Sequence, residues 1–394
     1  MTIQKIPYGR HFIDEADVAA VVDVLRHGAI TQGPKIAEFE KAVAEYVGAK
    51  YAVAVSNGTA ALHLACLAAG IGPGDNVVTT PNTFVASANC ALYVGANPQF
   101  ADIDAQTLNM DPAALQDKCR KLGKVKAIIP VHFGGVPCDM PAIKQVADQY
   151  GAIIIEDASH ALGASYPQGG KVGNCAYAQM TVFSFHPVKI IAAGEGGMIT
   201  TNDAELYRKL LKLRSHGINK LDDGFLNNDL ALDNGEANPW YYEMQDIGYN
   251  YRITDIQSAL ALSQLGKLKQ FLARRLEVAL NYDQAFKGME FLTLPQQAGR
   301  PYSAHHLYVL RIDFAKLGKS RRVVMNELLA AGVGTQVHYI PVHLHPYYQK
   351  LGHKPGDYPV AESYYREALS IPQFFGLTAS DQALVINKVT EVCA

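Results

Sequence analysis

The chain has 394 residues, of which 49% are hydrophobic and 18% are charged, and its formal net charge at pH 7 is −2. At roughly 100–200 residues per domain, this length predicts two domains, each able to bury a core. The balance of 35 basic against 37 acidic side chains excludes the strongly basic surface that nucleic acids or anionic membranes select, so we expect neither as a partner.

The six cysteines favour a reducing compartment. None belongs to a C-x-x-C pair, and Cys66, Cys90 and Cys175 stand among apolar or small residues, so we expect neither a disulfide framework nor a zinc site. The first residues, Met1 to Lys5, show no apolar signal segment, and no run is long enough to span a membrane. The sequence therefore predicts a cytoplasmic protein.

Between residues 49 and 201, short β-branched runs alternate with helical patterns. This alternation predicts an α/β fold whose sheet is mostly parallel and is flanked by crossover helices. The run Ala152 to Ile155 is apolar on both faces, as a buried parallel strand is. The predicted strands cover residues 51–55, 76–80, 98–103, 125–131, 152–156, 180–185 and 197–200.

The second half of the chain has a different pattern. Residues 203–214 predict an amphipathic helix, and residues 219–242 are polar and irregular, which predicts a long loop of the kind that is usually functional or mobile. One long helix is predicted over 255–280. A strand at 307–312, a helix at 321–331 and a strand at 334–338 then indicate a smaller α+β domain. We expect a large domain at residues 1–255 and a small C-terminal domain at 256–394.

In open α/β sheets, ligands bind beyond the carboxyl ends of the strands, and Ser56-Asn57-Gly58-Thr59-Ala60 stands at one such end. Gly58 lets the backbone approach an anion, the following amides face it with the positive end of a helix dipole, and Thr59 adds a hydroxyl donor. The same residues also suit an ordinary helix N-cap at Ser56 or Asn57. Taken alone, the segment is compatible with either role.

A second segment, Glu156-Asp157-Ala158-Ser159-His160, directly follows the apolar strand. An acidic pair at the end of a buried strand is costly unless something compensates it. A protonated pyridine nitrogen would compensate Asp157, and the ion pair would keep that ring cationic and electron-withdrawing. A helix cap or a metal-binding carboxylate is the alternative.

The third segment runs from Phe183 to Lys189, and the glycines of residues 194–197 follow it closely. Ser184 ends a predicted strand and can donate to a phosphate, while Lys189 follows in a turn, where a partly buried amine can form a Schiff base. Most turn lysines are merely solvated, and the glycines alone suit a hairpin turn. The order of the three segments along the chain is informative. A phosphate-binding segment, a carboxylate and an amine on successive strand ends predict a pyridoxal phosphate (PLP) site centred on Lys189.

These motifs, together with Arg214-Ser215-His216-Gly217, resemble the DegT/DnrJ/EryC1/StrS sugar aminotransferases from about Pro7 to the C-terminus. The resemblance implies a PLP-dependent enzyme of fold type I, an α/β fold that forms homodimers with shared active sites. It implies that Lys189 holds the cofactor covalently, that Asp157 pairs with the ring nitrogen, and that Phe84 stacks on the ring. The implied catalytic residues are Lys189, Asp157 and His160, and the implied cofactor-binding residues are Gly58, Thr59, Phe84, Asp157, His160, Ser184, Lys189 and, from the other subunit, Asn250.

Two positions depart from the common family pattern. Many members have glutamine where His160 stands, and many have an aromatic residue where His186 stands. A few members in which histidine replaces the lysine are dehydratases, so the presence of Lys189 favours transamination.

The segments around Thr31 and around His338-Tyr339 are most similar to the family branch of the pseudaminic acid pathway. This similarity implies transfer of the amino group of L-glutamate to C4 of a nucleotide-linked 4-keto-6-deoxy sugar, UDP-2-acetamido-2,6-dideoxy-β-L-arabino-hexos-4-ulose. The implied substrate-binding residues are Thr31, His186, His338 and Tyr339.

Alternatives remain at this point. The enzyme could use another dTDP-, GDP- or UDP-linked keto-sugar. A non-catalytic PLP-binding regulatory protein would usually carry a further DNA-binding or partner domain, and a cysteine desulfurase would need a reactive cysteine in a mobile loop. His343 and His345 lack an evident third ligand, so a packed or surface pair is favoured over a metal site.

Overall fold

The computed structural model describes residues 5–220, 224–296 and 298–393. A seven-stranded sheet with the order β1-β7-β6-β5-β4-β2-β3 lies at its centre, and the neighbouring strands from β6 to β3 are parallel. The mostly parallel α/β sheet expected from the sequence is thereby confirmed. Its strands are β1 (Tyr51–Val55), β2 (Asn76–Thr79), β3 (Asn97–Phe100), β4 (Ala127–Ile129), β5 (Ile153–Asp157), β6 (Met180–Ser184) and β7 (Gly197–Thr201).

Strand β7 runs antiparallel to both of its neighbours, β1 and β6. Residues 185–196 join β6 to β7 without a helix, and a parallel return would need a longer crossover. The connection therefore turns back directly at the carboxyl end of β6. Lys189 lies within this turn, which places it over the strand ends.

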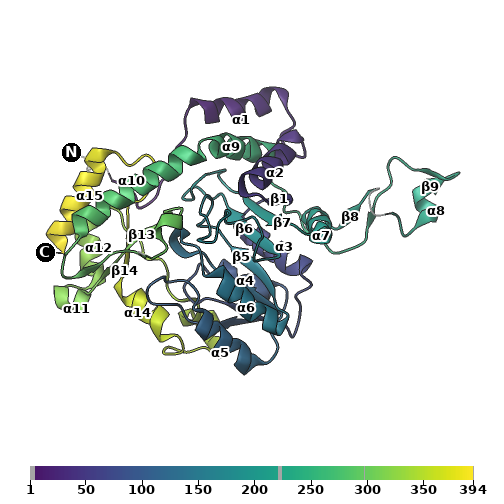
Figure 1. Ribbon diagram of the computed structural model, residues 1–394. Coiled ribbons are helices and arrows are strands. Elements are labelled where there is room, and N and C mark those ends of the chain that lie inside the picture. The colour runs from purple at the N-terminus through teal and green to yellow at the C-terminus, as the bar shows by residue number, and fades with distance from the viewer. Residues whose placement is uncertain (1–4, 221–223, 297, 394) are drawn as a thin grey trace.

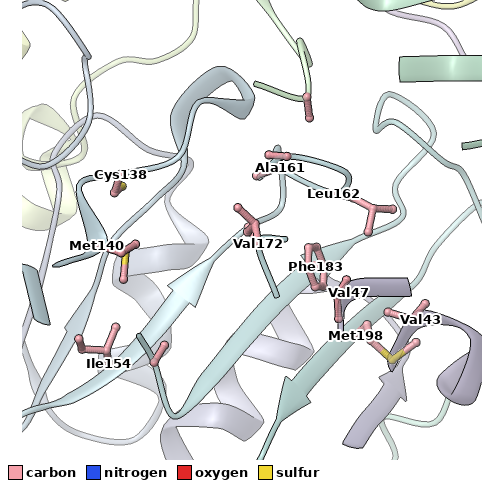
Figure 2. Close-up of a cluster of buried hydrophobic side chains, with 14 of the residues drawn as sticks. Val43, Val47, Cys138, Met140, Ile154, Ala161, Leu162, Val172, Phe183 and Met198 are labelled. Atoms are coloured by element: carbon pink, nitrogen blue, oxygen red, sulfur yellow. The ribbon is translucent and has the colours of Figure 1, made fainter. Parts of the chain in front are cut away.

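The two faces of the sheet bury separate sets of side chains, because alternate residues of a strand point to opposite faces. Ile154 of β5 packs with α2 (Pro34–Val47), α5 (Pro112–Leu122) and α6 (Met140–Tyr150). Figure 2 shows part of this layer, with Val43 and Val47 of α2 near Phe183 and Met198 of the sheet. The other face, which includes Ile155, packs with α3 (Gly58–Ala68), α4 (Ala86–Tyr93) and α7 (Ala204–Arg214).

The single long helix predicted over residues 255–280 is wrong. Two helices, α9 (Asp255–Gly266) and α10 (Leu268–Phe286), meet at Lys267, whose φ of −98° and ψ of −2° interrupt the helix geometry. The Lys267 amine lies 2.5 Å from a carboxylate oxygen of Asp14 and 2.7 Å from one of Asp17, at the start of α1 (Glu15–His27). These ion pairs and the weak helix propensity of Gly266 account for the break.

The C-terminal part has a core of its own, in which α10 packs against a three-stranded sheet of order β12-β13-β14 and the helices around it. Ile6 also belongs to this core, and Phe271 belongs to the core of the large sheet, so a division at residue 255 stays a prediction. The elements of this part are β12 (Leu292–Thr293), β13 (Tyr308–Ile312), α11 (Phe314–Leu317), α12 (Arg321–Ala330), α13 (Pro346–Lys350), α14 (Pro359–Glu367), β14 (Ala368–Ile371) and α15 (Ala379–Val392), with the 3-10 turns η2 (Arg300–Tyr302) and η3 (Val342–Leu344). A further 3-10 turn, η1 (Phe133–Gly135), follows β4 of the large sheet.

The strand predicted at residues 334–338 is also wrong. Gln336 pairs with Ser370 only in an isolated bridge, and the residues that follow, His338 and Tyr339, line the central cavity described below. His338 forms a side-chain hydrogen bond with the Ser370 hydroxyl at 2.7 Å. A side-chain hydrogen bond to Ser370 therefore stands here where a continued strand would form a backbone hydrogen bond.

Among the described residues, 218–220 and 224–247 form an arm that extends away from the rest of the molecule (Figure 1). The segment predicted as a long loop contains short elements within the described residues, namely β8 (Ile218–Asn219), α8 (Asn228–Ala231), β9 (Leu232–Asp233) and β10 (Glu236–Ala237), and β11 (Glu243–Met244) follows it. The arm carries large apolar side chains in solvent, among them Trp240 at 74% and Ile247 at 79% exposure.

Candidate active site

A cavity of about 1010 Å³ lies at the carboxyl ends of the sheet strands. It is lined by all of the side chains that the sequence proposed for catalysis, cofactor or substrate except Thr31 and Asn250. Thr31 instead pairs with Thr254, and Asn250 with Ser215, both at exposed positions of the same chain. The sequence-predicted residues that line the cavity are Gly58, Thr59, Phe84, Asp157, His160, Ser184, His186, Lys189, His338 and Tyr339.

Lys189 presents a buried amine to this cavity. Among the described residues, no hydrogen bond or ion pair involves that amine, although the backbone N–H of Lys189 donates to the His186 carbonyl at 2.8 Å. Burial lowers the pKa of Lys189 to about 8, with Asp157 acting in the opposite direction. A lysine amine in this environment is partly neutral near neutral pH and therefore nucleophilic.

An anion can bind at the start of α3. The Asn57 side chain caps this helix by accepting the Ala60 N–H at 2.8 Å, and the first N–H groups of the helix have no partner within it. A Cβ atom added to Gly58 would lie 3.0 Å from the Ser184 Cβ, so a larger residue would force Ser184 to shift by a few tenths of an ångström. The helix start and the Ser184 hydroxyl thus converge at one end of the cavity, and Asn57 acts as cap while Gly58 and Thr59 stay available to a ligand.

The acidic pair at the end of β5 is divided between two environments. Asp157 lines the cavity, whereas Glu156 is fully buried and accepts hydrogen bonds at 2.6 Å from both His132 Nε2 and the Tyr166 hydroxyl. The Cys138 backbone N–H donates to His132 Nδ1 at 3.0 Å, which leaves the ring proton on Nε2 for Glu156. Glu156 is therefore compensated inside the protein, and Asp157 remains directed at a ligand.

His160 is held as a neutral imidazole. Its Nδ1 accepts the Gly134 N–H at 3.3 Å, so the ring proton lies on Nε2, 3.0 Å from the Tyr339 hydroxyl oxygen that accepts it. Burial, together with Lys189 and His338, holds the pKa of His160 well below its usual value. Since both nitrogens have protein partners, His160 offers the cavity its ring face, and Tyr339 keeps its own proton to donate.

Among the cavity residues that the sequence analysis did not propose are Tyr8 and His306. Tyr8 comes from the N-terminal segment, and its ring lies 5.3 Å from that of His338. His306 lies 4.5 Å from the His160 ring, and within the described part of the chain its buried Nδ1 has no hydrogen-bond partner. Burial lowers the pKa of both His306 and His338, so the cavity wall is rich in uncharged imidazoles. No local sequence signal marks Tyr8 or His306, because tertiary packing alone brings them here.

The residues present fit pyridoxal phosphate. A buried amine without a partner among the described residues, a helix start with Gly58 packed closely against Ser184, and a carboxylate on a further strand end supply one group for each functional part of that cofactor. Phe84 is 59% exposed at the cavity edge, where an aromatic ring can lie against it.

No helix among the described residues is long and apolar enough to cross a membrane.

Comparison with known proteins gives a consistent result. The DegT/DnrJ/EryC1/StrS aminotransferase family matches residues 11–390. The spore coat polysaccharide biosynthesis protein SpsC of Bacillus subtilis is 42% identical over 392 residues, which cover 98% of this chain and 97% of that protein.

Two solved structures have the same fold. PseC of Helicobacter pylori, described as an aminotransferase of pseudoaminic acid biosynthesis, is 32% identical with a TM-score of 0.88, over 99% of each chain. A putative sugar aminotransferase of Streptococcus pneumoniae in its PLP form is 30% identical with a TM-score of 0.86, over 99% of this chain and 98% of that chain. This chain therefore belongs to the DegT/DnrJ/EryC1/StrS family and is a PLP-dependent sugar aminotransferase.

Proposed function

We propose that this enzyme transfers the amino group of L-glutamate to C4 of a nucleotide-linked 4-keto-6-deoxy sugar. The observation that supports this proposal most strongly is the buried Lys189 amine, which has no protein partner among the described residues and shares one cavity with Asp157. Our preferred substrate is UDP-2-acetamido-2,6-dideoxy-β-L-arabino-hexos-4-ulose, a step toward pseudaminic acid. Two observations support this choice: the motifs around Thr31 and Tyr339, and the likeness in fold to the H. pylori enzyme.

The roles of the chain's own residues follow from their positions. When bound, pyridoxal phosphate supplies an electron sink for amino transfer. Lys189 holds the cofactor at rest and, once released, takes a proton from the donor carbon and later delivers one to C4 of the sugar. Asp157 would pair with the ring nitrogen, and Gly58, Thr59 and Ser184, which line the same cavity, would hold the phosphate. Two substrates that use one cavity in turn imply ping-pong kinetics.

A substrate panel tests the proposal. The purified enzyme is supplied with UDP-, dTDP- and GDP-linked 4-keto sugars and a 3-keto sugar, with L-glutamate, L-glutamine or L-alanine as donor. We expect the highest kcat/KM for the UDP-linked 2-acetamido substrate with L-glutamate, and a product whose new amine NMR assigns to C4. Preference for another nucleotide sugar would overturn the pseudaminic assignment.

We also propose that the enzyme is a homodimer in which Asn250 of one subunit reaches the cofactor phosphate of the other. The described residues that line the cavity include one lysine and no arginine, although both substrates carry carboxylates or phosphates. A second copy could supply the missing cations, and the apolar arm gives it a surface to bind. A cytoplasmic location stays a prediction.

Mixing two inactive variants tests the shared site. Lys189→Ala and Asn250→Ala protomers, each inactive alone, should regain about a quarter of wild-type activity when exchanged into hybrid dimers, because half of the dimers then contain one intact site. If both variants stay inactive after verified subunit exchange, the two residues do not serve one site from opposite subunits.

A further inference from the structure

The Asp157 carboxylate is held from two separate parts of the chain. Its Oδ1 accepts the Ser159 N–H at 3.0 Å, within the turn that follows β5. Its Oδ2 accepts the Ser87 hydroxyl at 2.6 Å, from the first turn of α4. Asp157 lines the cavity, whereas Ser87 is fully buried behind it and does not line the cavity. The carboxylate plane is therefore fixed by contacts that no ligand needs to supply.

The direction of the hydrogen bonds around Ser87 can be assigned. Its hydroxyl lies 2.6 Å from Asp157 Oδ2, 2.7 Å from the Thr83 hydroxyl and 3.4 Å from the Phe84 carbonyl. Ser87 has one proton, and an ionised carboxylate only accepts. Ser87 therefore donates to Asp157, and Thr83 donates to Ser87.

This chain of two hydroxyls is directed at the Asp157 carboxylate. Hydrogen bonds to a charged acceptor are roughly twice as strong as those between neutral groups, so the bond from Ser87 to Asp157 is the stronger of the two. Ser87 is fully buried behind the cavity, whereas Thr83 is also buried but lies at the cavity wall.

A serine in the first turn of a helix often bonds only to its own backbone. Here that contact, to the Phe84 carbonyl, is the longest of the three, and the contact to Asp157 is the shortest. The nearby Cys90 thiol donates to the Ser87 carbonyl and leaves the hydroxyl free for Asp157. The geometry thus favours a role toward Asp157 over a purely local one.

We propose that Ser87, supported by Thr83, is a positioning residue that fixes the orientation of the Asp157 carboxylate for the ring nitrogen of the cofactor. This inference rests on the proposed role of Asp157. Two of the roughly four lone-pair sites of the carboxylate are occupied by Ser87 and Ser159, and the others stay available on the cavity side. Asp157 can therefore receive the ring N–H without moving.

The affinity of the apoprotein for PLP tests the inference, measured by fluorescence titration together with the pH midpoint of the bound cofactor's absorbance. Ser87→Ala should weaken PLP binding about tenfold, equivalent to about 1.4 kcal/mol, and should shift the midpoint. Thr83→Val leaves Ser87 in place and should weaken binding about threefold. Cys119→Ala, a buried change on α5 that removes no hydroxyl, is the packing control and should lower Tm without changing either readout.

A double-variant cycle separates positioning from packing. In an Asp157→Asn background, Ser87→Ala should cause no further loss of PLP affinity. Equal losses in both backgrounds, or wild-type affinity and midpoint for Ser87→Ala and Thr83→Val, would refute the role of Ser87. If Ser87→Ala does not fold, the PLP affinity and the pH midpoint of Thr83→Val test the role of Ser87 instead. Wild-type affinity for Asp157→Asn alone would instead refute the proposed role of Asp157.

Discussion

The floor of the cavity and its outer edge are built in different ways. On the floor, Asp157 accepts hydrogen bonds from the buried Ser87 hydroxyl and the half-buried Ser159 N–H, and behind it Glu156 Oε2 accepts two from His132 and Tyr166. At the edge, Phe84 is largely exposed, and the arm carries Trp240 and Ile247 into solvent. We infer that one chain by itself fixes the carboxylate and the lysine for the cofactor ring, whereas the binding of the cofactor phosphate and of the sugar is completed by a second copy.

The largest expected effect concerns the floor. Lys189→Ala should lower amino transfer by about a thousandfold or more, because the variant loses both the group that holds the cofactor and the proton carrier. The exposed Lys354→Ala serves as the control and should keep wild-type turnover. Retained turnover in Lys189→Ala would place the chemistry elsewhere.

The next effect concerns the edge. Replacing both Trp240 and Ile247 with serine should weaken dimerisation by about a hundredfold or more, since each buried large side chain contributes about 1.5–3 kcal/mol. Analytical ultracentrifugation across a concentration series measures the dissociation constant. Leu351→Ser, an exposed apolar residue outside the arm, is the matched control. Unchanged dimerisation in the arm variant would show that the arm does not form the interface.

A third prediction uses the lowered pKa of Lys189. Only the neutral amine adds to PLP, so the rate of cofactor addition to the apoprotein should rise with pH about a midpoint near 8, rather than near the ordinary lysine value of 10.5. Stopped-flow absorbance gives the rate, and N-acetyl-lysine methylamide measured in parallel removes the titration of PLP itself. A midpoint above 10 would mean that the Lys189 amine is not desolvated.

The smallest expected effect concerns Glu156, which lies behind Asp157. Tyr166→Phe removes one of the two hydrogen bonds to Glu156 and should lower the free energy of unfolding by about 1–2 kcal/mol, with PLP affinity unchanged. The control is Tyr177→Phe, because the Tyr177 ring packs on Tyr166. It should change the free energy of unfolding by less than about 0.5 kcal/mol. A loss of PLP affinity in Tyr166→Phe would show that Glu156 also serves the cofactor.

The sequence predicted the parts of the site that local patterns encode. Gly58, Asp157 and Lys189 each follow or lie near a strand whose pattern is unmistakable, and all line the cavity. The direction of β7 was not specified by its own residues, because it depends on the length of the connection before it. The break at Lys267 depends on carboxylates more than two hundred residues earlier in the chain.

Ser87, Tyr8 and His306 could not be found in this way. Ser87 stands in a helical pattern of small residues, where nothing indicates a carboxylate partner from another strand. Tyr8 and His306 reach the cavity only through the packing of the terminal parts of the chain. Thr31 and Asn250 lie outside the cavity of their own chain, so their proposed roles depend on an assembly that a single chain does not show.

Identifying the residue that carries the cofactor tests the central claim most directly. The holoenzyme is reduced with borohydride, which makes the link between cofactor and lysine permanent, and is then digested and analysed by mass spectrometry. The account predicts a pyridoxyl group on the peptide that contains Lys189, and on no other lysine. A label on another lysine, or no label on protein that has bound PLP, would contradict it.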